Sequence, residues 1–258
     1  MKNVAASRPL TLYLVLVFVG FWGCLALGTV AGFRFWVPIL GAFAPAAAAL
    51  IVVVFEQGEP AARDLIRRLF AWRVHPAWYL AAVGIPVVQN LCAVGTAAAS
   101  GSFALARVPP VLPVLPAMWT VFLFAAGEEV GWRGFLLPRL LATRGAVSAS
   151  ILVGVIHAVW HWPLIVLPHQ YLSGVPLVAF SVFVVSEAFL FTWLSQNTGG
   201  SVLLAALLHG SSNGAMLFYG GIAPELAPWL KASISALTAV VLVLTCGPLL
   251  RAGRITTR

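Results

Sequence analysis

The chain has 258 residues, of which 61% are hydrophobic and 9% are charged, and its mean hydropathy is +1.00. This composition excludes a soluble domain and, because the long apolar runs do not alternate with polar residues, a membrane β-barrel. The net charge of +8 fits arginine-rich loops beside a membrane and indicates no nucleic-acid partner. We therefore expect an all-α, polytopic helical membrane protein with a single membrane domain over residues 1–258.

Eight apolar runs are long enough to cross a hydrocarbon core, which takes about 20 residues each. The first continues too far for a signal peptide, so we predict that it is the first transmembrane helix. The three cysteines, Cys24, Cys92 and Cys246, lie inside apolar runs, and we expect them to behave as small buried hydrophobic residues. The predicted spans are about 10–32, 36–55, 76–99, 113–130, 146–167, 175–196, 200–220 and 226–250.

The basic residues predict how the chain is oriented in the membrane. With the N-terminus in the cytoplasm, 11 lysines and arginines face inward and 3 face outward, so both termini are expected in the cytoplasm, with the chain in the plasma membrane.

Residues 60–78 form a basic amphipathic segment that could lie in the interface against lipid headgroups. An ordinary positive-inside loop is the simpler interpretation of the same residues.

Two adjacent acids, Glu128 and Glu129, are predicted at the cytoplasmic-side end of the fourth span. An ionisable group at membrane depth is a functional-site hypothesis by default. Glu129 can pair with Arg133 four residues on, whereas Glu128 points about 100° away on a helix. Glu128, without a local counter-ion, is the better candidate for a general base. The alternative is a Glu–Arg pair that only closes the helix end.

Histidines occur in two other spans. His157 and His161 are four residues apart and share one helical face, and His209 has the same spacing to Asn213. Together with the acid pair, these side chains come from three separate helices. Such a cluster could hold and deprotonate a water molecule or bind a divalent metal.

Several protease classes are excluded by missing motifs. HExxH is absent, which rules out a zincin-type helix. An intramembrane aspartyl protease needs two aspartates in the membrane, and the only aspartate is Asp64, in a predicted loop. Residues 210–214 match G-x-S-x-G but lack the strand–turn–helix context that this motif requires. We interpret them as small residues that allow close helix packing.

Three motifs in order resemble one known family. They are Glu-Glu-x-x-x-Arg from residue 128, a histidine within Trp-His-Trp-Pro at 160–163, and His-x-x-x-Asn at 209–213. This pattern resembles the CPBP family, the CAAX prenyl protease type II or abortive-infection (ABI) proteins, over roughly residues 115–220. The resemblance implies a membrane-embedded endopeptidase that cleaves near a C-terminal, often prenylated, cysteine motif, or that processes peptides. Its partners would be the lipid bilayer and a peptide or lipidated protein substrate.

The resemblance also implies roles for individual residues. Glu128 and His161 would activate the water. His209 and Asn213 would complete the site as metal ligands or as donors to the oxyanion. A divalent metal such as zinc would be held by Glu128, His161 and His209, although the motif leaves open whether a metal is required.

Two positions depart from the family pattern. His157 stands where an aromatic residue is usual, and we assign it a packing or supporting role, with a further ligand as the alternative. Glu187 lies in an otherwise acid-free span, where the sequence does not decide between a proton or metal partner and a polar cleft. Glu129 and Arg133 would form the supporting pair beside the catalytic groups.

Two functions of other classes remain open from the sequence. In an ion-coupled transporter, Glu128, Glu187 and the histidines would form a proton relay, but no inverted repeat supports this reading. In a catalytically silent immunity or scaffold protein, the same pocket would bind a peptide. The high content of alanine, arginine and glycine suggests a GC-rich bacterial source.

Overall fold

The computed structural model describes residues 2–31, 40–108, 115–168, 170 and 172–251. These residues form helices and no strands; one isolated bridge joins Phe103 and Ile222. The helices are α1 (Lys2–Ala31), α3 (Ala44–Gln57), α4 (Glu59–Arg67), α5 (Pro76–Ala99), α6 (Leu115–Glu129), α7 (Leu137–Leu141), α8 (Ala146–Val166), α9 (Leu177–Asn197), α10 (Val202–Ala215) and α11 (Ala227–Cys246). Four shorter segments are η1 (Arg68–Phe70), η2 (Leu105–Arg107), the π-helical η4 (Val130–Leu136) and η5 (Met216–Gly221).

The predicted fold class, a polytopic helical membrane protein, is confirmed. Six helical stretches in the described part of the chain are long and apolar enough to cross a membrane. The other two predicted spans differ from a simple crossing. One corresponds to α3, which has 14 residues, and residues 36–39 of that prediction lie outside the described residues. The other is predicted at 113–130, of which residues 113 and 114 lie outside the described residues. Its helix begins at Leu115, continues through η4 into α7 and ends at Leu141.

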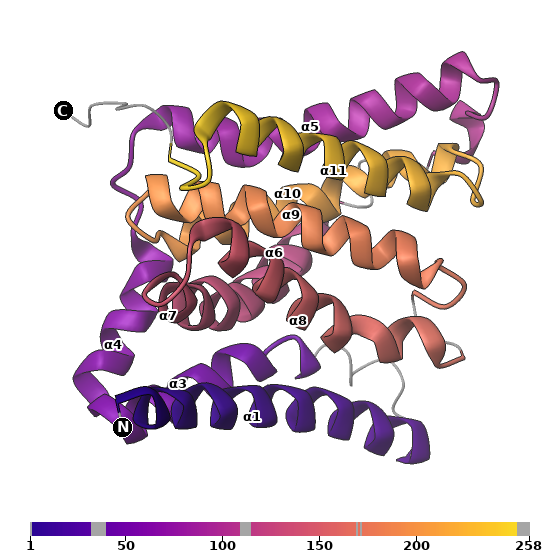
Figure 1. Cartoon of the computed structure of the whole chain (residues 1–258). Helices are drawn as coiled ribbons and strands as arrows, with labels where there is room; N and C mark the ends of the chain where they lie inside the picture. Colours follow the sequence, from indigo (N-terminus) through magenta and orange to yellow (C-terminus); the bar gives the residue numbers. More distant parts are fainter. Residues whose placement is uncertain (1, 32–39, 109–114, 169, 171, 252–258) are drawn as a thin grey trace.

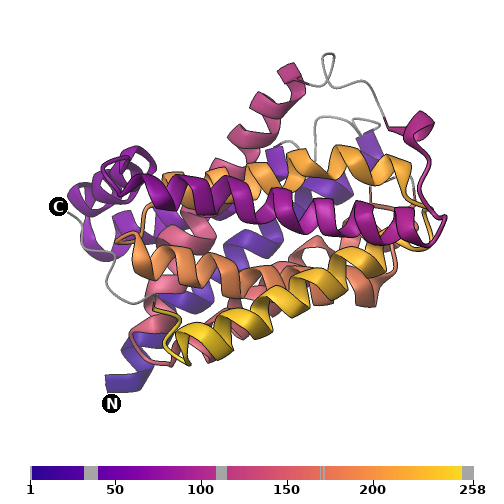
Figure 2. The same cartoon turned by 90° about the horizontal axis from the view of Figure 1, so that it is seen from above.

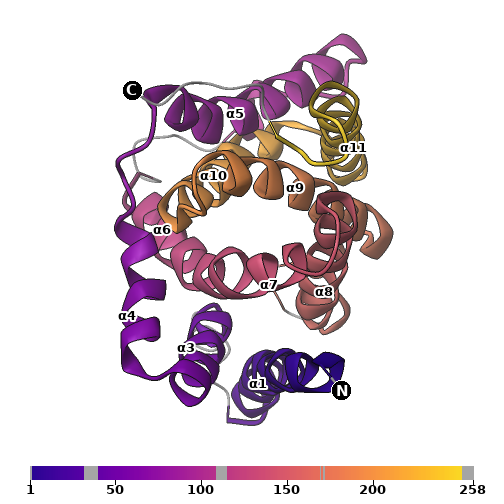
Figure 3. The same cartoon turned by 60° about the vertical axis from the view of Figure 1, so that its left-hand side comes forward.

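The helices are arranged around the motif-bearing segments (Figures 1 and 3). In Figure 3, α6, α7, α8, α9 and α10 occupy the middle of the molecule, with α1 and α3 on one side and α5 and α11 on the other. Figure 2 shows α5 and α11 lying lengthwise across one face, and the beginning of α6 projecting to the side. One apolar core joins α1, α3, η4 and α8, and a second joins α5, α9, α10 and α11.

Aromatic side chains attach α1 to the centre of the protein. Tyr13 packs against Phe135, with ring centroids 4.5 Å apart, and Phe21 packs against Trp160 at 4.2 Å. The indole N–H of Trp22 donates to the backbone carbonyl of Trp160 over 3.0 Å. Although the first span carries none of the three motifs, it supports the helices that do.

Glycines allow two close helix contacts next to the motifs. A Cβ atom at Gly127 would lie 2.7 Å from Cδ1 of Phe43, and one at Gly131 would overlap Pro45. A Cβ at Gly154 on α8 would lie 2.7 Å from the Cα of Val185 on α9. Small residues at these positions let the backbones approach as they do in other membrane helix pairs.

The cysteine prediction was wrong. Cys24 and Cys246 are half-buried and Cys92 is exposed, all three with free thiols. The physical reason is that the outward faces of membrane-spanning helices contact lipid, where an apolar side chain need not be buried in protein. An apolar run therefore does not show which of its residues point into the bundle.

Candidate active site

Glu128 and Glu129 lie in the middle of a long helix. The segments α6, η4 and α7 follow one another without a break from Leu115 to Leu141, so the acids are not at a helix end as predicted. The π-helical η4 begins directly after Glu129, and π-helical turns are frequent at functional sites. Only 7% of Glu128 and none of Glu129 is exposed. The motif is thus placed inside the bundle.

Glu129 is held by partners from two helices. Its Oε1 accepts a hydrogen bond from Nη1 of Arg133 over 2.8 Å, and it lies 2.8 Å from Nδ1 of His209 on α10. The predicted Glu129–Arg133 pair is confirmed. Because the pair is fully buried, each charge depends on the other for compensation. This arrangement fixes the carboxylate and orients the His209 ring.

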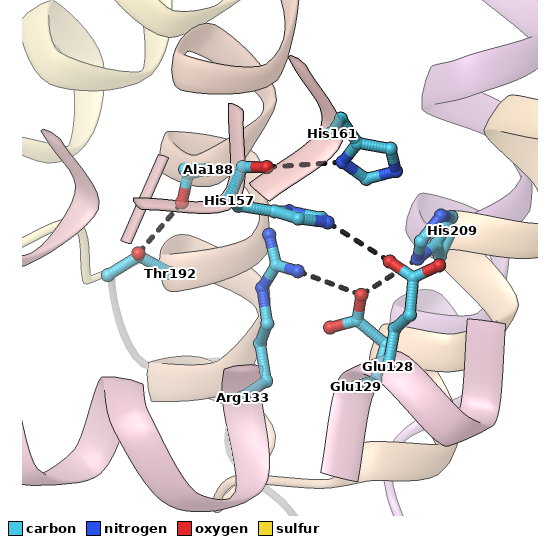
Figure 4. A network of polar contacts seen from close by, with 8 residues as sticks. All are labelled: Glu128, Glu129, Arg133, His157, His161, Ala188, Thr192 and His209. Carbon is cyan, nitrogen blue, oxygen red and sulfur yellow. Dashed lines mark hydrogen bonds and ion pairs between the residues drawn. The ribbon is translucent and has the colours of Figure 1, made fainter. Parts of the chain in front are cut away.

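Glu128 has a partner that the sequence analysis did not assign to it. Its Oε2 lies 3.0 Å from Nε2 of His157 on α8, and both side chains are buried. The sequence predicts only that Glu128 lacks a counter-ion on its own helix, and it gives His157 a packing or supporting role. The 100° that separates adjacent helical residues directs Glu128 toward α8 and Glu129 toward α10 (Figure 4).

The orientation of His161 follows from one backbone contact. Its Nδ1 lies 3.1 Å from the carbonyl oxygen of His157. Since a carbonyl only accepts hydrogen bonds, Nδ1 carries the proton, and Nε2 of the neutral ring is left as an acceptor. Glu128, His157 and His161 each offer one ligand-type atom, and these atoms all lie within 4.8 Å of one another.

The remaining predicted residues lie farther from this centre. His209 contacts Glu129, and Asn213, one turn later on α10, is exposed. Glu187 belongs to a separate polar cluster: its Oε1 accepts from Nε2 of Gln89 on α5 over 3.0 Å, and the same nitrogen donates to Thr238 on α11 over 3.1 Å. The structure therefore brings together the acid pair and three histidines but places Glu187 among other helices.

Aromatic residues enclose the site, and sequence reasoning had not assigned them a role there. The guanidinium carbon of Arg133 lies 3.6 Å from the ring centroid of Phe191 on α9, and the same ring meets His209 edge-on at 6.0 Å. Trp132 and Trp160 lie 4.9 and 5.9 Å from the His157 ring. The tryptophans fall within the quoted motifs, so their position was a usable signal. No pattern distinguished Phe191 from the other apolar residues of its span.

Glu128, His157 and His161 are of residue types that commonly bind a divalent metal. Two imidazoles and one carboxylate are a common zinc set, which leaves a fourth position for water. The Nδ1–H bond from His161 to a backbone carbonyl is also how metal-ligating histidines are usually oriented. Tetrahedral zinc ligands stand about 3.3 Å apart, so a largest separation of 4.8 Å requires a small side-chain movement. The structure groups His157 with Glu128 and His161, whereas the predicted ligands are Glu128, His161 and His209.

Comparison with known proteins supports the resemblance that the motifs indicate. Residues 110–215 match the model of the type II CAAX prenyl endopeptidase Rce1-like family. All three motifs lie within that stretch. CAAX prenyl protease 2 of Methanococcus maripaludis is 23% identical over 198 residues, which cover 70% of this chain and 71% of the relative. Over these residues the chain is similar to the CPBP/CAAX protease family. Proteins of this family are peptide hydrolases, so the relevant chemistry for the site is the activation of water.

Proposed function

We propose that this protein is a CAAX-type protease that cleaves a peptide bond of a membrane-associated substrate with water activated by Glu128. The observation that supports this most directly is the buried Glu128–His157 contact of 3.0 Å beside His161. A carboxylate screened from bulk water is a stronger base than one at the surface. The site thus combines a base with an acceptor nitrogen on a neighbouring side chain.

In this mechanism the water lies between Glu128 and His161. Nε2 of His161 accepts one hydrogen bond from the water, and Glu128 takes the other proton as the oxygen attacks the peptide carbonyl. His157 holds the Glu128 carboxylate in position. The protonated Glu128 then returns the proton to the nitrogen of the leaving amine, so that the base is regenerated.

His209 and Asn213 are proposed to stabilise the oxyanion that forms on the peptide carbonyl. Glu129 and Arg133 orient His209 from one side. With His209 in its imidazolium form, the two acids and the two cations balance, which lowers the cost of burying them. The Nε2–H would then point away from Glu129 and donate to the oxyanion. Asn213, four residues on, would provide a second donor from the same face of α10.

A divalent metal such as zinc, if held by Glu128, His157 and His161, would polarise the water and stabilise the developing negative charge. The proposal does not depend on a metal, since the residues themselves provide the base, the acceptor and the donors.

We propose a CAAX-like peptide or lipidated protein as substrate. That choice rests on the matched family and on the position of the site inside the bundle. The distribution of basic residues supports cytoplasmic termini in a bacterial inner membrane.

A peptidase assay tests the proposal. The purified full chain, reconstituted in liposomes, would be incubated with quenched fluorescent peptides that end in a CAAX-like sequence, with and without a prenylated cysteine. Glu128→Gln should abolish cleavage, while Glu187→Gln, a buried acid outside the site, should retain it. Full activity of Glu128→Gln would refute Glu128 as the base. Loss of activity with a chelator and recovery with zinc would add the metal to the mechanism, and full activity in chelator would remove it.

A further inference from the structure

A small polar cavity lies at the end of the bundle that carries the N-terminus and α4 (Figure 1). Its volume is about 190 Å³, and its lining comes from α3, α4, η1, η4 and α7. The polar lining includes Gln57, Asp64, Arg68 and Arg139, together with Gly134 of η4. The cavity is therefore adjacent to the helix that carries the catalytic motif but separate from its acids and histidines.

One positive charge in this cavity has no acidic partner among the described residues. Arg139 is paired with Glu56 over 3.0 Å, and Asp64 is paired with Arg67 over 3.0 Å. Arg68 instead donates from Nη1 to the backbone carbonyl of Gly134 over 3.3 Å. A guanidinium has five N–H donors, so most of those on Arg68 remain available to a ligand. The site fits a group with a single negative charge.

The side chains around the cavity indicate that it lies at the level of the lipid headgroups. Phe70, the last residue of η1, is 71% exposed, and Trp72, two residues later, is 62% exposed. Tryptophan at a helix end is typical of the membrane–water interface. Arg73 lies against the Trp72 ring at 5.4 Å, and Arg63 on α4 is exposed. This combination of exposed aromatic and basic residues on a short amphipathic helix and the segment after it is characteristic of interfacial segments.

We propose that the cavity binds the phosphodiester of an anionic phospholipid headgroup through Arg68. A phosphodiester carries one negative charge, and its two free oxygens match the paired donors of a guanidinium. The cavity is also large enough, since it would hold about six waters at their liquid volume of roughly 30 Å³ each. Basic pockets between membrane helices on the arginine-rich side commonly bind such headgroups. This inference is independent of the proposed catalytic function.

The test measures binding to the purified full chain in a neutral detergent. Native mass spectrometry would follow titrations with dihexanoyl phosphatidylglycerol, dihexanoyl phosphatidylcholine and inorganic phosphate. We expect one phosphatidylglycerol per chain, bound more tightly than phosphatidylcholine. Arg68→Gln should weaken this binding about tenfold, the effect of losing one charge-assisted contact. Arg68→Lys, which keeps the charge without the planar group, should weaken it less.

A matched control is available at the same end of the molecule. Arg144 is exposed and does not line the cavity, so Arg144→Gln should bind phosphatidylglycerol as the unmodified chain does. Equal binding of the two lipids would overturn the proposal. It would also be overturned by unchanged binding in Arg68→Gln or by an equal loss in Arg144→Gln. Inorganic phosphate that binds with the same affinity and the same dependence on Arg68 would make the ligand a free anion instead of a lipid.

Discussion

Glu128 and Glu129 are adjacent in the chain, yet they contact histidines on different helices. Glu128 meets His157 on α8 at 3.0 Å, whereas Glu129 meets His209 on α10 at 2.8 Å. Only Glu129 also has an ion pair with Arg133. The rotation between adjacent helical residues thus gives Glu129 a cationic partner, Arg133, and directs Glu128 to the imidazole of His157. This difference suits Glu129 to a supporting role and Glu128 to a catalytic one.

Replacement of His157 by phenylalanine tests whether this histidine takes part in catalysis. The substitution restores the aromatic residue usual in the family pattern and keeps a planar ring, but it removes the contact with Glu128. We expect kcat to fall about 10- to 100-fold, as is typical when a supporting hydrogen bond is lost, with little change in KM. Steady-state kinetics on the liposome assay would measure both. A kcat equal to that of the unmodified enzyme would show that His157 only packs.

Gly131 should be intolerant of a larger side chain because the backbone of α3 lies against it. A Cβ atom there would overlap Pro45, and overpacking of this kind typically costs about 1–3 kcal/mol. Gly131→Ala should lower the free energy of unfolding by that amount in mixed micelles titrated with SDS. Gly84→Ala is the matched control, since nothing lies within 4 Å of a Cβ at that position. Equal stability of the two variants would contradict the close α3–η4 contact.

The buried pair of Glu129 and Arg133 should show strong coupling in a double-mutant cycle. Either Glu129→Gln or Arg133→Met leaves one buried charge without its partner, which typically costs about 3–5 kcal/mol. The double variant removes both charges and should be less destabilised than the sum of the two single variants. Unfolding of all four proteins in SDS-containing micelles gives the coupling free energy. Additive effects would mean that the two side chains do not depend on each other in the folded protein.

The features that could be predicted from the sequence are those that depend on residues close together in the chain. Long apolar runs located the helices, with α5 found at residues 76–99 as predicted. A spacing of four residues predicted the Glu129–Arg133 pair. The contact between Glu128 and His157 depends on how α6 and α8 are rotated and positioned relative to each other, which a pattern within either helix does not contain. The same holds for Phe191, whose span shows no periodic signal.

The length of the continuous helix formed by α6, η4 and α7 shows a second limit of prediction from sequence. Charged residues at 128–133 suggested that the span ended there, because an unpaired charge inside a membrane is costly. In the structure Glu129 pairs with Arg133 on the same helix, and the two acids also contact histidines on α8 and α10. The helix therefore continues beyond these residues to Leu141. Contacts with these two histidines, which are distant in sequence, compensate the charges of the acids. For this reason the helix does not end near residue 130, where the sequence predicts its end.

Phe191 should act on catalysis through its contact with Arg133. A cation over an aromatic face is worth about 2 kcal/mol when both are desolvated, and here the guanidinium carbon is 3.6 Å from the ring centroid. Fluorination of the ring weakens this attraction step by step with only small changes in shape. We therefore expect log kcat to fall steadily as fluorine atoms are added to Phe191, and Phe191→Leu to lose roughly tenfold. The same analogues at Phe189, a partly buried residue of α9 that packs against the second apolar core, should leave kcat unchanged. A flat series at Phe191 would show that the ring contributes packing alone and that Arg133 is positioned by Glu129 without it.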